Sequence, residues 1–257
     1  MRSFITTLIS AALLAVPAFA HAKEHKKDVF VESIFTNSSS LYCSGTITQR
    51  GLVVTASHCA QNLSGEQAVS YVIHVGAKVN KKGTELVGGN QYSVNSENYY
   101  PQLPGIVFAK KNDKRMIGND LAVLFSQDIR NLVKGNTLGW TPEQYPITGH
   151  DKNGYDEKSS FFIQLPGTQY VECEQKNLPI DGYGVRLANC QNIIRKGDSG
   201  SPVFQKINGE RRLVGFVSGG DIFIPNDKKE YIGIQTFDPN KPIQVIKHAE
   251  SQKSAAS

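Results

Sequence analysis

The chain lacks the patterns that mark zinc-binding and nucleic-acid-binding proteins. Its 257 residues include 4 cysteines, and none of them forms a C-x-x-C pair, so no structural zinc site is expected. The net charge is +5, and the clusters of lysine and arginine have little aromatic interleaving, which argues against a nucleic-acid partner. Hydrophobic residues make up 39% and charged residues 20% of the chain, which is the usage of a folded globular protein.

Long apolar runs are also absent beyond the N-terminus. Arg2 precedes an apolar run at residues 8–16, and the small-residue sequence Ala-Phe-Ala-His-Ala follows at 18–22. This pattern predicts a secretory signal peptide at residues 1–22. An uncleaved membrane anchor is the alternative, but the run is shorter than the roughly 18 apolar residues of a membrane-spanning helix. We expect a mature protein that is secreted or periplasmic, without stable membrane insertion.

The four cysteines predict two disulfides in an exported chain. They allow three connectivities, and sequence order favours two short loops, closed by Cys43 with Cys59 and by Cys173 with Cys190. Each bridge is worth on the order of 3 kcal/mol in the chain-entropy account.

Short β-branched or alternating runs separated by Gly, Asn, Pro and Asp make up most of the remaining sequence, and helical periodicity is scarce. Strands are predicted at residues 44–48, 51–55, 69–75, 121–125, 161–164, 184–187, 202–206, 212–218 and 231–236. Short helices are plausible at residues 56–61 and 242–250. This spacing of short strands indicates an all-β sandwich or barrel.

One domain is expected, because neither an internal repeat nor a Pro-rich or Gly/Ser-rich linker divides the chain. We place it at residues 23–250. Residues 134–159, rich in Gly, Asn, Pro and Asp, are the best candidate for a connection between two β lobes, and residues 251–257 are expected to fray.

The strongest local motif is the hexapeptide Gly-Asp-Ser-Gly-Ser-Pro at residues 197–202. Its glycines and proline specify a tight turn, which would present Ser199 as a nucleophile while the amides of Gly197 and Ser199 converge on a developing oxyanion. An ordinary hairpin turn uses the same residue types, so the motif needs partners elsewhere in the chain.

Candidate partners are a histidine and an aspartate. His58 ends the β-rich run at residues 53–59, and its imidazole suits the base that activates a serine hydroxyl. Asp120 opens the apolar strand at 121–125, where a carboxylate needs a partner such as a histidine N–H. Taken singly, an Asn-Asp turn before the strand is the favoured explanation of Asp120. No role is assigned to the other five histidines, His21, His25, His74, His150 and His248.

Taken together and in this order, the three motifs resemble the trypsin/chymotrypsin superfamily. Residues 55–59, T-A-S-H-C, are similar to the family's T-A-A-H-C, and residues 120–124 are similar to its D-[IL]-A-[LV]-[LIV] segment. Residues 197–202 match a G-D-S-G-S-P variant familiar from secreted bacterial members, and the spacing of Cys43 and Cys59 matches the disulfide that brackets the family's histidine. The resemblance spans about residues 43–246.

The resemblance implies two antiparallel six-stranded β-barrels with a short C-terminal helix, and a serine endopeptidase without metal or organic cofactor. Ser199 would attack the scissile carbonyl, His58 would transfer the proton, and Asp120 would orient His58. Protein or peptide substrates are expected, and a monomer is favoured. The implied substrate-binding residues are Ile193, Ile194, Lys196, Ser218, Gly219 and Gly220.

The sequence also departs from the family. No I-V-G-G-like segment precedes Cys43, so the partner of Asp198 and the activation mechanism stay open. The family's cysteine four residues before the serine is Arg195 here. Ile193 and Ile194 replace the acid of trypsin-like members at the base of the pocket, and Val217 replaces the histidine of glutamate-specific members. An apolar specificity pocket is therefore predicted.

Two other functions fit the sequence less well. A non-catalytic binding or adhesive relative of this fold usually lacks a triad member, whereas all three are present. A lipase-type esterase would carry G-x-S-x-G with acid and histidine after the serine, which is not the order found here.

Overall fold

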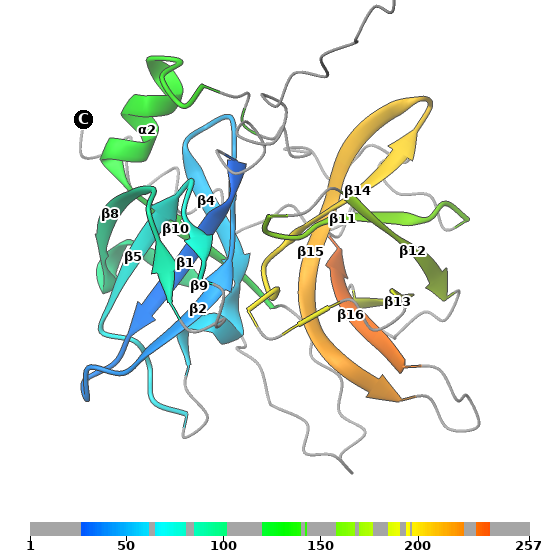
Figure 1. The fold of residues 1–257 in the computed structure, drawn as a ribbon, viewed down its shortest axis with the longest axis horizontal. Helices are drawn as coiled ribbons and strands as arrows, with labels where there is room; N and C mark the ends of the chain where they lie inside the picture. The colour runs from blue at the N-terminus through cyan, green and yellow to red at the C-terminus, as the bar shows by residue number, and fades with distance from the viewer. Residues whose placement is uncertain are drawn as a thin grey trace, which may run out of the picture.

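The structure is a computed structural model that describes residues 27–61, 65–80, 85–101, 120–139, 142, 158–167, 170–176, 185–190, 194–195, 197–223 and 230–236. Two β lobes lie side by side, the first coloured blue to green and the second green-yellow to orange (Figure 1). The predicted signal peptide, C-terminal helix and polar tail lie outside the described residues, as does most of the predicted connection at 134–159.

The first lobe consists of two four-stranded antiparallel sheets, with strand orders β2-β1-β5-β8 and β3-β4-β10-β9. Their strands are β1 (Val29–Ile34), β2 (Ser40–Ser44), β3 (Thr46–Ile47), β4 (Leu52–Ala56), β5 (Ser70–Val75), β8 (Asn90–Asn95), β9 (Tyr99–Pro101) and β10 (Leu121–Phe125). A small separate hairpin pairs β6 (Lys78–Val79) with β7 (Leu86–Val87).

The two sheets share chain segments at both edges. Only Gly45 separates β2 from β3, and only the 3-10 turn η3 (Ser96–Asn98) separates β8 from β9. Each of these two segments therefore leaves one sheet and enters the other. Counted in this way, the eight strands form six continuous chain segments, which enclose one core. That core is apolar, with Ile47, Ile73 and Leu124 fully buried.

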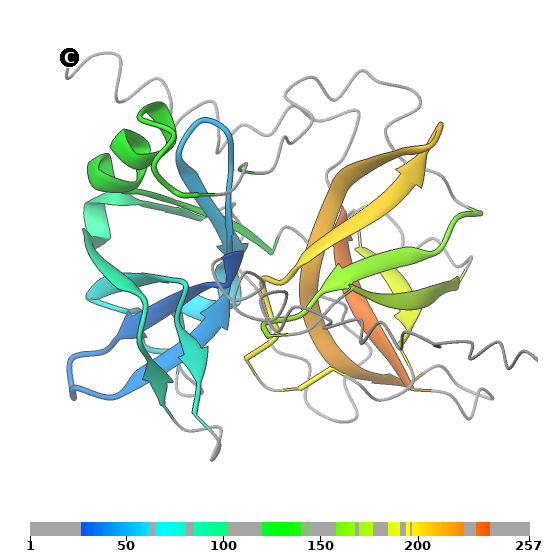
Figure 2. The same ribbon diagram turned by 45° about the horizontal axis from the view of Figure 1, so that its top comes forward.

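The second lobe is a closed six-stranded barrel with the order β11-β12-β13-β16-β15-β14 (Figure 2). Its strands are β11 (Phe161–Gln164), β12 (Tyr170–Lys176), β13 (Val185–Asn189), β14 (Pro202–Ile207), β15 (Glu210–Phe223) and β16 (Glu230–Thr236). The Cys173–Cys190 disulfide joins β12 to the end of β13, over a Cα–Cα distance of 4.5 Å. The prediction of an all-β, two-lobed barrel fold is confirmed.

A third apolar cluster joins the lobes. Residues of β4 and β10, including Val54 and Val123, pack there with Phe204, Leu213 and Phe216 of the second lobe. Every residue of β4 and of β10 is buried. These two strands lie between the core of their own lobe and the other lobe, which explains why their sequences are apolar apart from Thr55.

The helices are short. The 3-10 helix η2 (Ser57–Ala60) lies within the predicted helix at 56–61, whereas α2 (Gln127–Lys134) was not predicted. Ser126 caps α2 by accepting a hydrogen bond from the Ile129 amide at 3.4 Å, and Ile129 is the buried side chain of this helix. Within the described ranges, no helix is long and apolar enough to cross a membrane.

Candidate active site

Strand pairing brings His58 and Asp120 together. β4 and β10 are antiparallel, and Ala56 at the end of β4 pairs with Leu121 at the start of β10. The residues that follow β4 and the residue that precedes β10 therefore lie at the same edge of the sheet. The Ser57 amide donates to the Asp120 backbone carbonyl at 3.0 Å, which continues the ladder to this edge.

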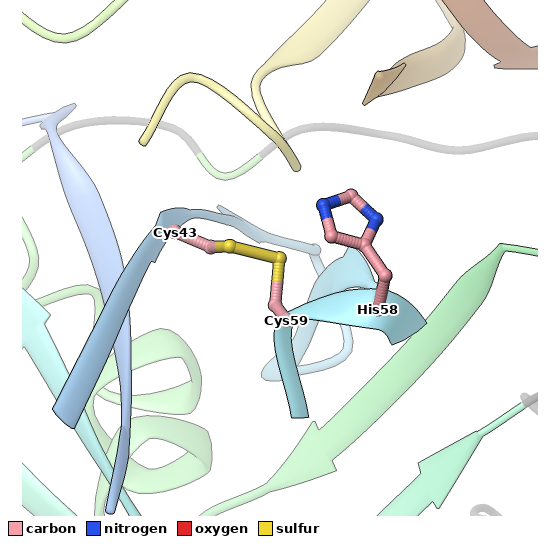
Figure 3. Close-up of side chains that lie close together, drawn as sticks. All are labelled: Cys43, His58 and Cys59. Atoms are coloured by element: carbon pink, nitrogen blue, oxygen red, sulfur yellow. A yellow bond between two sulfur atoms is a disulfide. The ribbon is translucent and has the colours of Figure 1, made fainter. Parts of the chain in front are cut away.

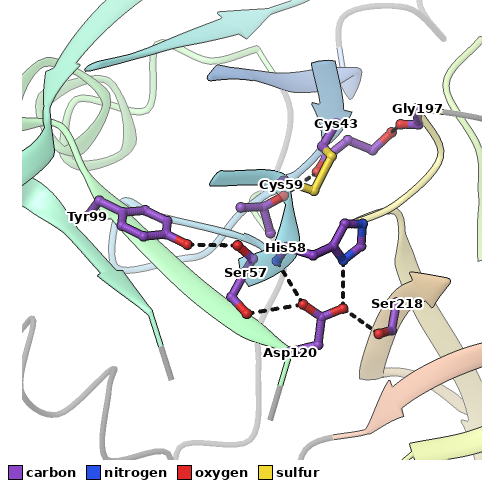
Figure 4. Close-up of a disulfide and its surroundings, with 10 residues drawn as sticks. Cys43, Ser57, His58, Cys59, Tyr99, Asp120, Gly197 and Ser218 are labelled. Carbon is purple, nitrogen blue, oxygen red and sulfur yellow. Dashed lines mark hydrogen bonds and ion pairs between the residues drawn. A yellow bond between two sulfur atoms is a disulfide. The ribbon is translucent and has the colours of Figure 1, made fainter. Parts of the chain in front are cut away.

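The Asp120 carboxylate is fully buried and accepts four hydrogen bonds (Figure 4). Ser57 Oγ donates to Oδ1 at 3.1 Å, and the His58 backbone amide donates to the same oxygen at 3.0 Å. His58 Nδ1 lies 2.9 Å from Oδ2, and the Ser218 hydroxyl donates to Oδ2. A buried carboxylate needs such donors, and a proton on Nδ1 leaves Nε2 as the basic nitrogen of the neutral ring.

Both lobes hold this carboxylate. Ser218 comes from β15, and Gln235 on β16 accepts a hydrogen bond from the Asp120 amide through Oε1 at 3.2 Å. The histidine–aspartate pair therefore lies at the junction of the lobes rather than inside the first lobe.

Two tyrosines back the pair from the first lobe. The Tyr99 hydroxyl donates to the Ser57 carbonyl at 3.0 Å, and the Tyr99 ring stacks on Tyr71 with centroids 4.7 Å apart. Burial, together with the charges of Tyr71 and Asp120, raises the pKa of Tyr99 well above its ordinary value of 10. Tyr99 therefore stays protonated and remains a donor to the turn that carries His58.

A disulfide lies against the His58 ring. Cys43 and Cys59 are joined with Cα atoms 6.1 Å apart, as predicted, and Figure 3 shows the imidazole above the Cys59 end of the bridge. One ring nitrogen of His58 and the two sulfurs lie within 4.8 Å of one another. Because the sulfurs are bonded to each other, they are not free to act as thiolate ligands of a metal, and the bridge instead ties the turn of His58 to β2.

Ser199 lies in a tight turn whose glycines have left-handed backbone angles. Gly197 has φ of +98° and Gly200 has φ of +84°. The Ser201 amide donates to the Asp198 carbonyl at 3.0 Å, and the Gly200 amide donates to Val217 of β15 at 2.7 Å. The predicted turn is therefore present and is attached to the second barrel.

The first lobe also holds this turn. The Ser44 amide, at the end of β2, donates to the carbonyls of Ser199 at 2.8 Å and Gly197 at 3.1 Å. Ser44 follows Cys43, which is bridged to the residue after His58. A short covalent and hydrogen-bonded route thus connects the turn of Ser199 to the turn of His58, and Figure 4 shows Gly197 beside this disulfide.

The partner of Asp198 is a backbone amide in the same turn. The Arg195 amide donates to Oδ2 at 2.6 Å, and the Asp198 amide donates to the Arg195 carbonyl at 3.1 Å. Burial raises the pKa of Asp198, and the Arg195 amide and charge partly offset that rise. The sequence did not identify a partner for the Asp198 carboxylate, and the structure gives it a hydrogen-bond donor three residues earlier in the chain.

The predicted substrate-binding residues fall into two groups. Ile193 and Lys196 lie outside the described residues. Ile194 is half-buried and packs against the core of the second barrel, and Gly219 and Gly220 lie in β15 next to Ser218. The Ser218 side chain is buried and bonded to Asp120, so its hydroxyl supports the histidine–aspartate pair.

Some residues of the site were not recognised from the sequence. In the sequence Ser57 is only a replacement for the alanine of the family motif, although its hydroxyl bonds to Asp120. No motif identifies Ser44, Tyr99 or Gln235 as site residues. Ser44 adjoins Cys43, which is a signal that could have identified it. Gln235 lies more than a hundred residues from Asp120 in sequence, and no local pattern connects them.

Comparisons with known proteins agree with this geometry. The Trypsin family model matches residues 20–239, whereas no curated protein matches the chain. The fold is similar to that of a thermostable serine protease, AL20, from an extremophilic microorganism (TM-score 0.54, 14% identity, 91% of this chain and 100% of that chain covered). It is also similar to HL collagenase (TM-score 0.52, 15% identity, 90% and 94% covered). The chain therefore belongs to the trypsin family of serine proteases.

Proposed function

We propose that this protein is a secreted serine endopeptidase with His58, Asp120 and Ser199 as its catalytic triad. The observation that supports it most directly is the His58–Asp120 pair, with Nδ1 and Oδ2 2.9 Å apart at the lobe junction. A carboxylate that is fully buried and bonded to an imidazole is the arrangement that orients a general base.

In this proposal Asp120 keeps the Nδ1 proton on His58, so that Nε2 accepts the proton of the Ser199 hydroxyl. Ser199 attacks the carbonyl carbon of the scissile bond, and His58 then gives the proton to the leaving amine. Water attacks the acyl-enzyme by the same route, which releases the second product and restores the serine. Asp120 stabilises the protonated ring throughout.

The amides of Gly197 and Ser199 are proposed as the oxyanion donors. The Asp198 carbonyl is held by the Ser201 amide. Because a trans peptide is planar, this bond also sets the direction of the Ser199 N–H on the opposite side of the same peptide. A donor that is aimed before the reaction stabilises the tetrahedral oxyanion without reorganisation.

The primary specificity pocket is proposed to be apolar. Ile194 packs on the apolar core of the second barrel, and Val217 is buried in that core. Neither supplies the charge that would select a basic or an acidic side chain. Substrates with medium or large hydrophobic side chains before the scissile bond are expected.

The test is hydrolysis of a mixed peptide library by mature protein starting near Lys23, with products identified by mass spectrometry. Ser199→Ala should abolish cleavage, while Ser33→Ala should retain it because the Ser33 hydroxyl is buried in the first lobe without a hydrogen bond. The cleaved bonds should follow hydrophobic residues. Equal cleavage by wild type and Ser199→Ala would refute the serine mechanism.

Secretion is part of the proposal and rests on the signal-peptide pattern together with the two disulfides, which form in oxidising compartments. Expression of the full chain followed by N-terminal sequencing of the exported protein tests it. A mature terminus within residues 21–23 is expected, and retention of the intact chain in the membrane fraction would contradict it.

A further inference from the structure

Ser44, which follows the disulfide-bonded Cys43, makes several hydrogen bonds across the lobe boundary. Ser44 is 2% exposed, ends β2 and lies where the first lobe meets the turn at residues 197–201, called here the nucleophile turn. Its amide is shared between two carbonyls of that turn, those of Gly197 at 3.1 Å and Ser199 at 2.8 Å. A donor shared in this way holds each acceptor less firmly than a donor of its own would.

The Ser44 hydroxyl compensates for the sharing. The Ser44 Oγ donates to the Gly197 carbonyl at 3.0 Å. The carbonyl oxygen of Gly197 therefore accepts a second hydrogen bond, and among the described contacts this hydroxyl donates to no other acceptor. Gly197, whose φ is +98°, has no Cβ, and this absence leaves its backbone unusually free to rotate. Two donors on its carbonyl oppose such rotation, together with the hydrogen bond from the Asp198 amide, on the same peptide, to the Arg195 carbonyl.

Ser44 is itself held firmly. Its carbonyl accepts a hydrogen bond from Thr55 Oγ1 at 2.7 Å, and Thr55 is buried in β4. Gly200 approaches the same carbonyl so closely that an added Cβ would lie 2.0 Å from the oxygen. The position of Ser44 is therefore set by β4 on one side and by the nucleophile turn on the other.

We propose that the Ser44 hydroxyl is a positioning group for the oxyanion donors, because it holds the Gly197 carbonyl from across the lobe boundary. The inference rests on the proposed endopeptidase function and adds a residue to it. Ser44 does not touch the substrate. It acts by fixing the peptide that follows the Gly197 Cα, which limits rotation about that Cα and so steadies the Gly197 N–H, the group that must point at the oxyanion in the transition state.

The role predicts a specific kinetic signature. Ser44→Ala removes one hydrogen bond, and the loss of one such bond typically lowers a rate or binding constant by about three- to tenfold. Here the loss should appear in kcat, with KM unchanged. A peptide boronic acid forms a tetrahedral adduct with the nucleophilic serine, so its affinity should fall by the same factor. The affinity for a product peptide, which places no oxyanion there, should not change.

The experiment measures kcat, KM, boronate affinity and product affinity for wild type, Ser44→Ala, Ser44→Gly and Ser33→Ala. Ser44→Gly removes the same hydroxyl by a different change, and therefore tests the role if the alanine variant folds poorly. Ser33→Ala is the matched control, since it removes a buried serine hydroxyl that has no hydrogen-bond partner. Both Ser44 variants should show the kcat and boronate losses, and the control should show neither.

Three results would overturn the inference. Unchanged kcat and boronate affinity in both Ser44 variants would remove the positioning role, while leaving the endopeptidase assignment intact. Equal losses for the boronate and the product peptide would indicate a general structural effect. A wild-type protein without Ser199-dependent hydrolysis would refute the proposed function and this inference together.

Discussion

Replacing Gly200 by alanine probes how closely the nucleophile turn fits the first lobe. The added Cβ would lie 2.0 Å from the Ser44 carbonyl oxygen and 2.6 Å from Thr55 Oγ1, and separations below 3.0 Å are essentially never seen. Because the carbonyl belongs to a buried residue that is held by Thr55 of β4, the turn itself would have to move, by about 1 Å at least. A displacement of that size near the reacting atoms is typically worth about 100-fold in rate.

The same variant also strains the backbone, and Gly209→Ala separates the two effects. Gly209 has φ of +83°, nearly that of Gly200, but nothing lies within 4 Å of its added Cβ. Left-handed strain alone costs about 1 kcal/mol, and overpacking adds about 2 kcal/mol at Gly200. For a chain of this size, Tm should fall by about 3 °C for Gly209→Ala and by about 10 °C for Gly200→Ala.

Thermal unfolding followed by near-UV circular dichroism, together with kcat/KM on a cleaved peptide, measures both quantities. Gly200→Ala is expected to lose about 100-fold in kcat/KM, and Gly209→Ala is expected to keep wild-type activity. If the two variants had the same Tm and the same kcat/KM, the close contact between the lobes would not matter and the reasoning would be refuted.

Three further predictions concern the charges and the disulfide of the site. Asp120→Asn should lower kcat about 1,000- to 10,000-fold at neutral pH in steady-state assays, because an amide cannot hold the Nδ1 proton as a carboxylate does; a loss below tenfold would contradict its role. Burial raises the pKa of Asp198 above its ordinary value of 3.8, so the native state keeps this proton to higher pH than the unfolded chain. The free energy of unfolding should therefore fall as pH rises through that interval, and urea titrations should show a flatter fall for Asp198→Asn; an identical slope would contradict this. Replacing both Cys43 and Cys59 by serine should cost about 3 kcal/mol in guanidinium unfolding, and an unchanged midpoint would exclude stabilisation by this bridge.

The sequence predicted well those elements whose signals are local. β10 is a continuous apolar run and β4 is one apart from Thr55, and the turn at 197–202 carries its own glycines and proline. Strands with weaker patterns were missed. β8 is largely polar, with Val94 as its buried residue, and β12 alternates with charged residues. In both cases pairing with neighbouring strands outweighs the sequence preference.

The candidate triad residues and both disulfide pairings could be read from the sequence because motif order and cysteine spacing are properties of the chain itself. The contacts that support these residues could not. Ser218 and Gln235 reach Asp120 only because the second barrel packs against the first. Ser44 reaches Gly197, which is 153 residues away in sequence, for the same reason.

The sequence by itself determined the residue types of the proposed reaction, since a nucleophile, a base and an acid each need a specific functional group. Only the tertiary structure decided how these groups are held. Hydrogen bonds across the lobe junction depend on positions set by two separate barrels, and no local pattern encodes the distance between them. The donor to Asp198 was settled in the same way, by the fold of a turn that brings the Arg195 amide to its carboxylate.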